Sequence, residues 1–203
     1  MTRHRKLLLS LLTAGVLILA GLFLAERYCP PEGIAFTQDR REVHRLKNRT
    51  TRPKATDFDP RVTLSALLQP GNDSNRWSTS HAARVEGYVM SLANAEVELA
   101  NCYTPCRRDI HINLALRPDA PASEQVVLEV TPELRKWAAT QGWDWSEAKL
   151  KQELIGHWCS FEGWLFFDKY HAGESENIAP GRQGNWRATA WEIHPVTNFQ
   201  VLR

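Results

Sequence analysis

The stretch that decides the fold is Arg108-Asp-Ile-His-Ile-Asn-Leu-Ala-Leu116, in which polar and apolar side chains alternate. Successive side chains of a β-strand point to opposite faces of a sheet. The apolar side chains at the even positions from 110 to 116 therefore share one face, and Asp109, His111 and Asn113 share the other. This pattern predicts a strand that buries one of its faces.

Four other segments have the composition and alternation of strands. They are Ala83–Met90, Gln125–Thr131, His157–Asp168 and Arg187–Pro195. Residues 169–186, between the last two, contain a proline and several glycines, so we expect a long loop there.

A helical interruption separates the third and fourth strands. Thr131-Pro-Glu133 supplies an N-cap, a proline at the first helical position and an acid in the first turn. We expect this helix to run to about Ala139. A second helical segment, capped by Asp144, is expected to carry Leu150 and Leu154.

The order strand, strand, strand, helix, strand, strand resembles that of the OB-fold, a five-stranded Greek-key barrel. Two similar motifs support the resemblance, Val85-Glu-Gly-Tyr-Val89 in the first strand and Phe161-Glu-Gly-Trp-Leu165 in the fourth. A strand that bends round a small barrel needs glycine where a side chain would crowd the interior. The resemblance covers residues 80–203 and implies a mostly-β, OB-fold-like barrel, with its helix between strands three and four. A small lipocalin-like barrel or a sandwich is the alternative.

Four motifs also resemble those of a bacterial group of membrane-anchored or exported proteins to which no function is assigned. They are Asp109-Ile-His-Ile112, Glu129-Val-Thr-Pro132, Gly163-Trp-Leu-Phe-Phe-Asp168 and Trp191-Glu-Ile-His-Pro195.

The N-terminus is typical of a transmembrane signal-anchor, to which we assign residues 1–25. The basic segment 3–6 precedes an uncharged apolar run over residues 7–25. At about 1.5 Å per residue, a helix of this run nearly crosses a hydrocarbon core of about 30 Å. The basic flank predicts a single pass through the inner or plasma membrane, a cytoplasmic N-terminus and a periplasmic or extracellular domain. A cleaved signal peptide is the alternative, although a cut after Ala25 would place the bulky Phe23 at position −3.

Residues 26–79 are predicted to be a polar linker, because no apolar periodicity persists and prolines interrupt the stretch. Seven Lys/Arg and one Glu lie between Arg40 and Lys54. We interpret this run as a solvated, self-repelling spacer, with contact to anionic headgroups as the alternative. Residues 61–69 are expected to form a short helix.

Four cysteines in an exported chain predict disulfides. Cys102 and Cys106 bracket the turn-like Tyr-Thr-Pro, and we expect these two to be bridged. Half of a zinc site is the alternative reading of this spacing. The spacing does not determine whether Cys29 and Cys159 pair.

Titratable side chains on three of the strands are predicted to share one outer face of the barrel, provided that the second, third and fifth strands are neighbours. They are Asp109, His111, Glu129, Glu192 and His194. We expect this exposed patch to bind a ligand or a divalent metal, with His111, Glu192 and His194 as the candidate metal ligands. A solvated polar sheet face without function is the alternative.

Further ligand-binding candidates lie near this face. Asp168 and His171 are placed where the fourth strand enters the long loop, and loops of OB-folds commonly bind ligands. Tyr88 and Trp164 are predicted to lie opposite the core, where aromatic rings stack against ligands.

Charge and motif content restrict the function. Residues 61–203 hold 14 Lys/Arg against 17 Asp/Glu, which argues against bulk nucleic-acid binding. The phosphate-binding loop, the Gly-x-Ser-x-Gly elbow and the His-Glu-x-x-His pair do not occur in the sequence. We expect a membrane-tethered binding module for an oligosaccharide, peptide, oligonucleotide or partner protein. The alternative is a metal-dependent, nuclease-like hydrolase on the same barrel, by analogy with the staphylococcal nuclease class of OB-folds.

Overall fold

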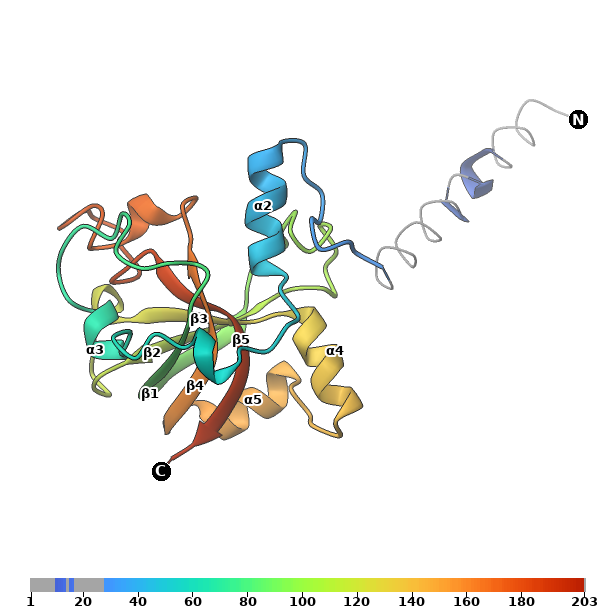
Figure 1. Ribbon diagram of the computed structural model, residues 1–203. Helices are drawn as coiled ribbons and strands as arrows, with labels where there is room; N and C mark the ends of the chain where they lie inside the picture. The colour runs from blue at the N-terminus through green and yellow to red at the C-terminus, as the bar shows by residue number, and fades with distance from the viewer. Residues whose placement is uncertain (1–9, 14, 17–27, 203) are drawn as a thin grey trace, which may run out of the picture.

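The computed structural model describes residues 10–13, 15–16 and 28–202 and contains a closed five-stranded β-barrel (Figure 1). The strands are β1 (Ala82–Asn94), β2 (Ile110–Ala115), β3 (Val126–Val130), β4 (Trp158–Phe167) and β5 (Trp191–Val201). They follow the order β1-β2-β3-β5-β4 around the barrel, and β4 pairs with β1 to close it. The predicted mostly-β barrel is therefore confirmed.

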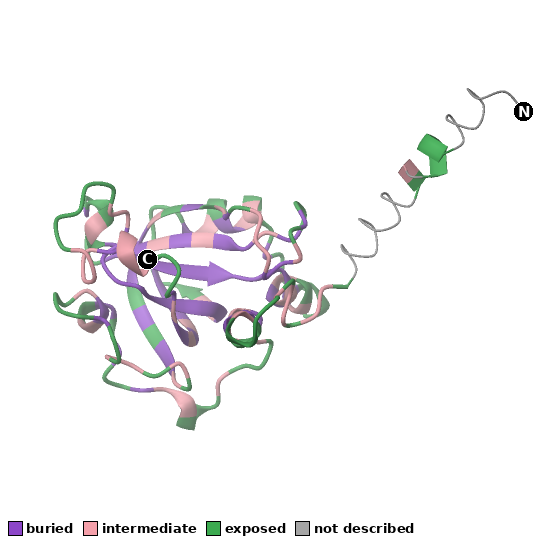
Figure 2. Cartoon of the chain, turned by 90° about the horizontal axis from the view of Figure 1, so that it is seen from above, coloured by how far each residue is buried: buried purple, intermediate pink, exposed green. Residues whose placement is uncertain are grey.

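The strand pairs are antiparallel except for β3 and β5, which run parallel. Ile112 lies opposite Leu128, and Leu128 lies opposite Ile193 on the far side. These three side chains are fully buried in the core. Figure 2 shows buried residues along the strands and exposed residues mainly in the outer connections. The alternation that predicted the strands thus also selects the side chains that fill the barrel.

Two helices join β3 to β4, namely α4 (Pro132–Thr140) and α5 (Glu147–Leu154). Thr131 caps α4 as predicted, because its side-chain oxygen accepts a hydrogen bond from the first helical turn. The cap of α5 is Ser146 rather than Asp144. Asp144 instead accepts a hydrogen bond from the backbone N–H of Ser146, which makes a turn just before the helix.

The predicted short helix in residues 61–69 is α3 (Leu64–Leu67). Both terminal leucines of α3 are buried in the barrel core. Short 3-10 helices lie in the connecting segments: η1 (Ala55–Asp57), η2 (Ala122–Glu124) and η3 (Ala172–Glu174).

The stretch expected to be a linker also contains α2 (Gln38–Lys47), which packs against β5. In Figure 1, α2 stands on the barrel beside the loop that joins β1 to β2. Asn48, at its C-cap, donates a 2.9 Å hydrogen bond to the carbonyl of Ala100 in that loop. Charge dominates the sequence of α2, and its buried side chains are Val43 and His44. The apolar signal in the sequence is therefore too weak to predict a helix here.

The predicted membrane anchor, residues 1–25, lies outside the described residues except at positions 10–13, 15 and 16. Within the part of the chain that the structure describes, no helix combines the length and the apolar character needed to span a bilayer.

The structure corrects the predicted Cys102–Cys106 bridge. Cys102 is bonded to Cys29, 73 residues earlier in the chain, with 5.9 Å between the two Cα atoms. Cys106 has an exposed thiol and Cys159 a buried one. The segment after Cys29 runs beside the loop that follows β1, where Ile34 donates a 2.8 Å backbone hydrogen bond to Leu99. This tertiary contact brings Cys29 and Cys102 together, and their spacing in the sequence gives no sign of it.

Candidate functional site

A pocket of about 530 Å³ opens between α2, the loop after β1 and the loop after β4. Its walls are formed by Lys47, residues 94–98, His111, Glu129, Asp168, His171, Glu174 and Trp186. A larger cavity of about 920 Å³ lies beside α3, but none of the described residues that line it is a histidine. The concentration of titratable groups therefore identifies the smaller pocket as the candidate site. We call it the His111 pocket.

The strand pairing brings His111 of β2 directly opposite Glu129 of β3. Nε2 of His111 lies 2.9 Å from Oε1 of Glu129. The ring of His111 also stacks nearly parallel to that of Trp186, with 6.4 Å between ring centroids and 9° between planes. One wall of the pocket is therefore a pair of flat rings, of which the imidazole is held by a buried carboxylate.

Beneath the pocket lie the side chains of Asp109, Glu129, Glu192 and His194, which we call the buried cluster. Nδ1 of His194 is 3.3 Å from Oε2 of both Glu129 and Glu192, but the geometry of a hydrogen bond is met for Glu192 alone. Nε2 of His194 is 3.9 Å from Oδ2 of Asp109. The structure thus brings together all five residues that alternation placed on one face.

The buried cluster differs from the expected exposed patch, because each of its four side chains is at most 4% exposed. Three segments cover this face of β2, β3 and β5. They are α2, the loop between β1 and β2, and the long loop between β4 and β5. Strand periodicity reports which side chains share a face, but it carries no information about distant segments that cover that face.

Arg187 links the buried cluster to the wall of the pocket. Its side chain is fully buried, with Nη1 2.5 Å from Oε1 of Glu192 and Nη2 3.3 Å from Oδ2 of Asp168. Arg187 stands before β5, in a segment that Asp73 fixes by accepting hydrogen bonds from Thr189 and from the backbone N–H of Ala190. The guanidinium therefore neutralises two carboxylates that lie inside the protein.

Asp168 and His171 form a second imidazole–carboxylate pair. Nδ1 of His171 is 2.7 Å from Oδ2 of Asp168, and its ring meets that of Trp186 edge to face. The hydrogen bond to Asp168 raises the pKa of His171. Burial alone would raise the pKa of Asp168, but His171 and Arg187 lower it to about 2. Asp168 therefore fixes the ring orientation of His171 and leaves its Nε2 for a ligand.

The imidazoles of His111 and His194 hold their protons tightly. Burial would lower the pKa of His111, but Glu129 and the other carboxylates raise it to about 9. Burial likewise opposes protonation of His194, whose pKa Glu129 and Glu192 nevertheless raise to about 10. For Asp109, burial and repulsion by Glu129 raise the pKa to about 7. Charged imidazoles and a carboxyl that titrates near neutrality thus lie within one small volume.

Tyr88 and Trp164 lie away from the His111 pocket. The indole N–H of Trp164 donates to the carbonyl of Thr51, and the guanidinium of Arg49 covers its ring at 4.8 Å from the centroid. The ring of Tyr88 packs edge to face against Trp158. The stretch that was expected to be a linker, residues 26–79, thus contacts Trp164. Neither Tyr88 nor Trp164 lines the pocket.

Sequence reasoning missed Lys47, Glu98, Trp186 and Arg187. Lys47 of α2 forms an ion pair with Glu98, and Trp186 donates from its indole nitrogen to Oε2 of Glu174. A signal existed for Arg187, because this arginine stands at the start of an otherwise uncharged run that leads into β5. Nothing local pointed to Lys47 and Glu98, which are 51 residues apart.

Comparison with other proteins gives no further assignment: no family model, curated protein or solved structure matches this chain.

Proposed function

We propose that this chain is a binding protein on an OB-fold-like barrel, and that the His111 pocket receives a small polar ligand or the end of an oligomer. The strand order β1-β2-β3-β5-β4, with α4 and α5 between β3 and β4, supports the OB-fold interpretation. The apolar run at residues 7–25 supports a tethered, extracytoplasmic location.

One observation carries the proposal, the ring pair of His111 and Trp186 in the wall of a pocket of about 530 Å³. Small-molecule sites are concave, have volumes of roughly 300–1,000 Å³ and combine flat apolar surface with a few fixed polar groups. Because α2 and two loops cover the strand face, an oligomer enters the pocket by one end rather than along the strands. A saccharide, a peptide terminus and a nucleotide each have suitable polar groups.

A thermal-shift screen of soluble saccharides, short peptides and nucleotides tests this proposal. A pocket ligand raises the melting temperature of the wild type, and Trp186→Ala abolishes this rise because the stacking wall is lost. Trp143→Ala is the matched control, since Trp143 is 44% exposed and does not line the pocket. A ligand that stabilises the wild type and Trp186→Ala equally would place the binding site elsewhere.

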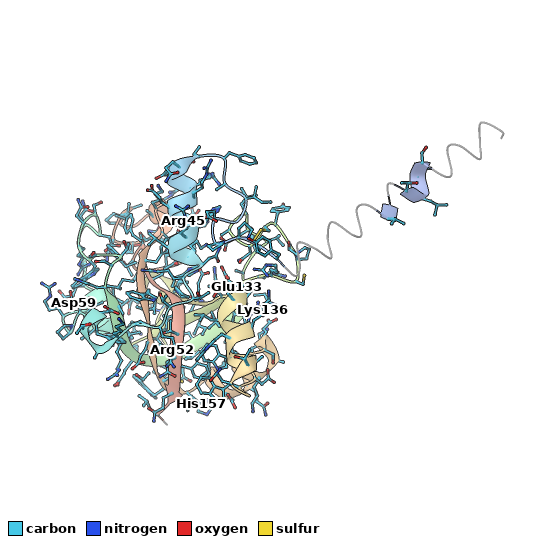
Figure 3. The ribbon with its side chains drawn as sticks, turned by 45° about the vertical axis from the view of Figure 1, so that its right-hand side comes forward. Arg45, Arg52, Asp59, Glu133, Lys136 and His157 are labelled. Carbon is cyan, nitrogen blue, oxygen red and sulfur yellow. A yellow bond between two sulfur atoms is a disulfide. The ribbon has the colours of Figure 1, made fainter. Side chains whose placement is uncertain are left out.

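The Asp168–His171 pair favours a second candidate function, hydrolysis of the bound ligand. A carboxylate that fixes the tautomer of an imidazole at a pocket wall is a common arrangement for general acid–base catalysis. His171→Gln is then expected to lower turnover by roughly 10²–10⁴-fold while ligand binding persists. His157→Gln is the control, because His157 lies at the opposite end of the molecule from Arg45 on α2 (Figure 3). Unchanged turnover in His171→Gln would leave binding as the sole function.

A further inference from the structure

The side chains of Asp109, Glu129 and His194 converge from three neighbouring segments of the barrel. Asp109 precedes β2, Glu129 is in β3, and His194 is in β5. Each contributes one potential ligand atom, and these atoms lie within 4.8 Å of one another. All three residues are at most 3% exposed. The adjacency of β2, β3 and β5 in the barrel fixes this convergence on rigid elements.

Several polar atoms of these residues have no hydrogen-bond partner among the described residues. They are both carboxylate oxygens of Asp109, Oε2 of Glu129 and Nε2 of His194. The nearby guanidinium of Arg135 donates to the carbonyl of Arg108 rather than to Asp109. A buried carboxylate without a donor is strongly destabilising, so such atoms point to a partner of another kind.

We propose that Asp109, Glu129 and His194 bind a divalent cation below the floor of the His111 pocket. A single cation takes one ligand atom from each of the three residues. Nε2 of His194 and Oδ2 of Asp109 are 3.9 Å apart, near the separation of about 3.4 Å between two tetrahedral ligands with bonds of 2.1 Å. One imidazole nitrogen and two carboxylates suit Zn²⁺ or Mn²⁺.

The neighbouring groups have the arrangement expected around a metal. Nδ1 of His194 is hydrogen-bonded to Glu192, and Glu192 is in turn paired with Arg187. His111 holds the other oxygen of Glu129. A carboxylate on the far nitrogen of a ligating histidine fixes its tautomer and orientation. His111 and Glu192, which sequence reasoning offered as ligands, thus orient the ligands instead.

The charge balance also favours a cation. Seven carboxyl groups line the pocket or belong to its floor: Glu96, Glu98, Asp109, Glu129, Asp168, Glu174 and Glu192. Five basic side chains accompany them when His194 binds the cation through a neutral ring: Lys47, His111, Arg135, His171 and Arg187. With the two remaining imidazoles protonated, the set carries two excess negative charges, which a divalent cation neutralises.

Metal binding by the full-length, untagged chain tests the proposal directly. The exposed thiol of Cys106 binds soft cations, so all variants carry Cys106→Ser. After EDTA treatment and buffer exchange, Zn²⁺ and Mn²⁺ are titrated by calorimetry, and retained metal is measured by mass spectrometry. We expect one equivalent of at least one of the two cations and a rise in melting temperature. Asp109→Asn and His194→Gln are expected to weaken binding by at least tenfold.

Two variants separate this proposal from misfolding and from the proposed function. Asp109→Asn removes an unpartnered buried charge, so its metal-free form should be at least as stable as the wild type while the metal-dependent rise disappears. His171→Gln should retain one equivalent of metal, even though it alters the His111 pocket. Failure of the wild type to bind either cation, or equal binding by Asp109→Asn, would overturn the cation site and leave the proposed pocket untouched.

Discussion

Arg187 is the cation that two carboxylates inside the protein share. It is fully buried and neutralises both Glu192 and Asp168. Arg187→Met keeps much of the side-chain volume but leaves the buried Glu192 without its cation and Asp168 with His171 alone, and breaking such a buried pair costs about 3–5 kcal/mol. We expect urea unfolding to show a loss of this size. Arg117→Met is the control, because Arg117 is 45% exposed in its ion pairs and should cost at most about 1 kcal/mol. Equal losses in the two variants would contradict this account.

Asp168 gives the stability of the protein a specific dependence on acid pH. Its pKa is about 2 in the folded chain, below the ordinary value of 3.8. A carboxyl whose pKa is lowered on folding contributes stability above its unfolded pKa, and this contribution is lost as the pH falls through the folded pKa. The free energy of unfolding should therefore fall between about pH 4 and pH 2, by an amount on the order of 2 kcal/mol from this group.

Asp168→Asn should reduce this fall in the free energy of unfolding between about pH 4 and pH 2, measured by urea unfolding at successive pH values. Glu153→Gln, at a side chain that is 39% exposed, should leave this loss of stability as large as in the wild type. An equal loss of stability at acid pH in both variants would assign the acid sensitivity to other carboxylates.

At the scale of single residues, the sequence predicted which site residues meet but not their surroundings. Alternation placed His111, Glu129 and His194 on one face, because side-chain direction in a strand depends only on position. It offered no means of predicting their burial, since Lys47 reaches the site from α2, a segment far away in the sequence. Convergence is a local property of strands, whereas burial depends on everything that packs above them.

Among the elements, β4 depends on Gly163 in the way that the repeated Glu-Gly motif suggests. A Cβ atom at this position would lie 2.6 Å from Cγ2 of Ile193 and against the carbonyl of Pro195. The pairing of β4 with β5 also shifts register at this glycine. Gly163→Ala therefore forces apart two paired strands, and we expect a loss of about 1–3 kcal/mol in the free energy of unfolding.

Gly173→Ala provides the comparison for Gly163→Ala. Its added methyl would meet only the end of the flexible Arg182 side chain, at 3.2 Å. This variant should unfold within about 0.5 kcal/mol of the wild type. Equal stability of the two alanine variants would mean that β4 and β5 separate at little cost.

Strands and capped helices were predictable from the sequence, whereas α2 was not. β2 and α4 carry their own signals, a clean alternation in the one and a Thr-Pro-Glu start in the other. In α2 a charged sequence buries Val43 and His44 and is fixed by partners outside the helix, such as the carbonyl of Glu32 that contacts His44 at 2.6 Å. Such a helix depends on tertiary contacts, which local propensity does not report.

For the whole molecule, the Cys29–Cys102 bridge predicts a definite pattern of thiol reactivity. In non-reduced native protein, an alkylating reagent should modify Cys106, whose thiol is exposed. Cys159 should react only after denaturation, because it is buried and burial raises its pKa to about 11. Peptide mapping of the alkylated protein should recover Cys29 linked to Cys102. A linked pair of Cys102 and Cys106, with Cys29 alkylated, would contradict the arrangement.

The same bridge determines where mechanical load travels. A pull on the chain ahead of Cys29 reaches the sulfur–sulfur bond first and passes through Cys102 into the loop between β1 and β2. Since α2 begins only at Gln38, it lies outside this path and stays seated over the barrel under tension. When a reductant cleaves the disulfide, the same pull acts instead on the noncovalent contacts of the segment that leads to α2. The first of these is the backbone hydrogen bond from Ile34 to Leu99.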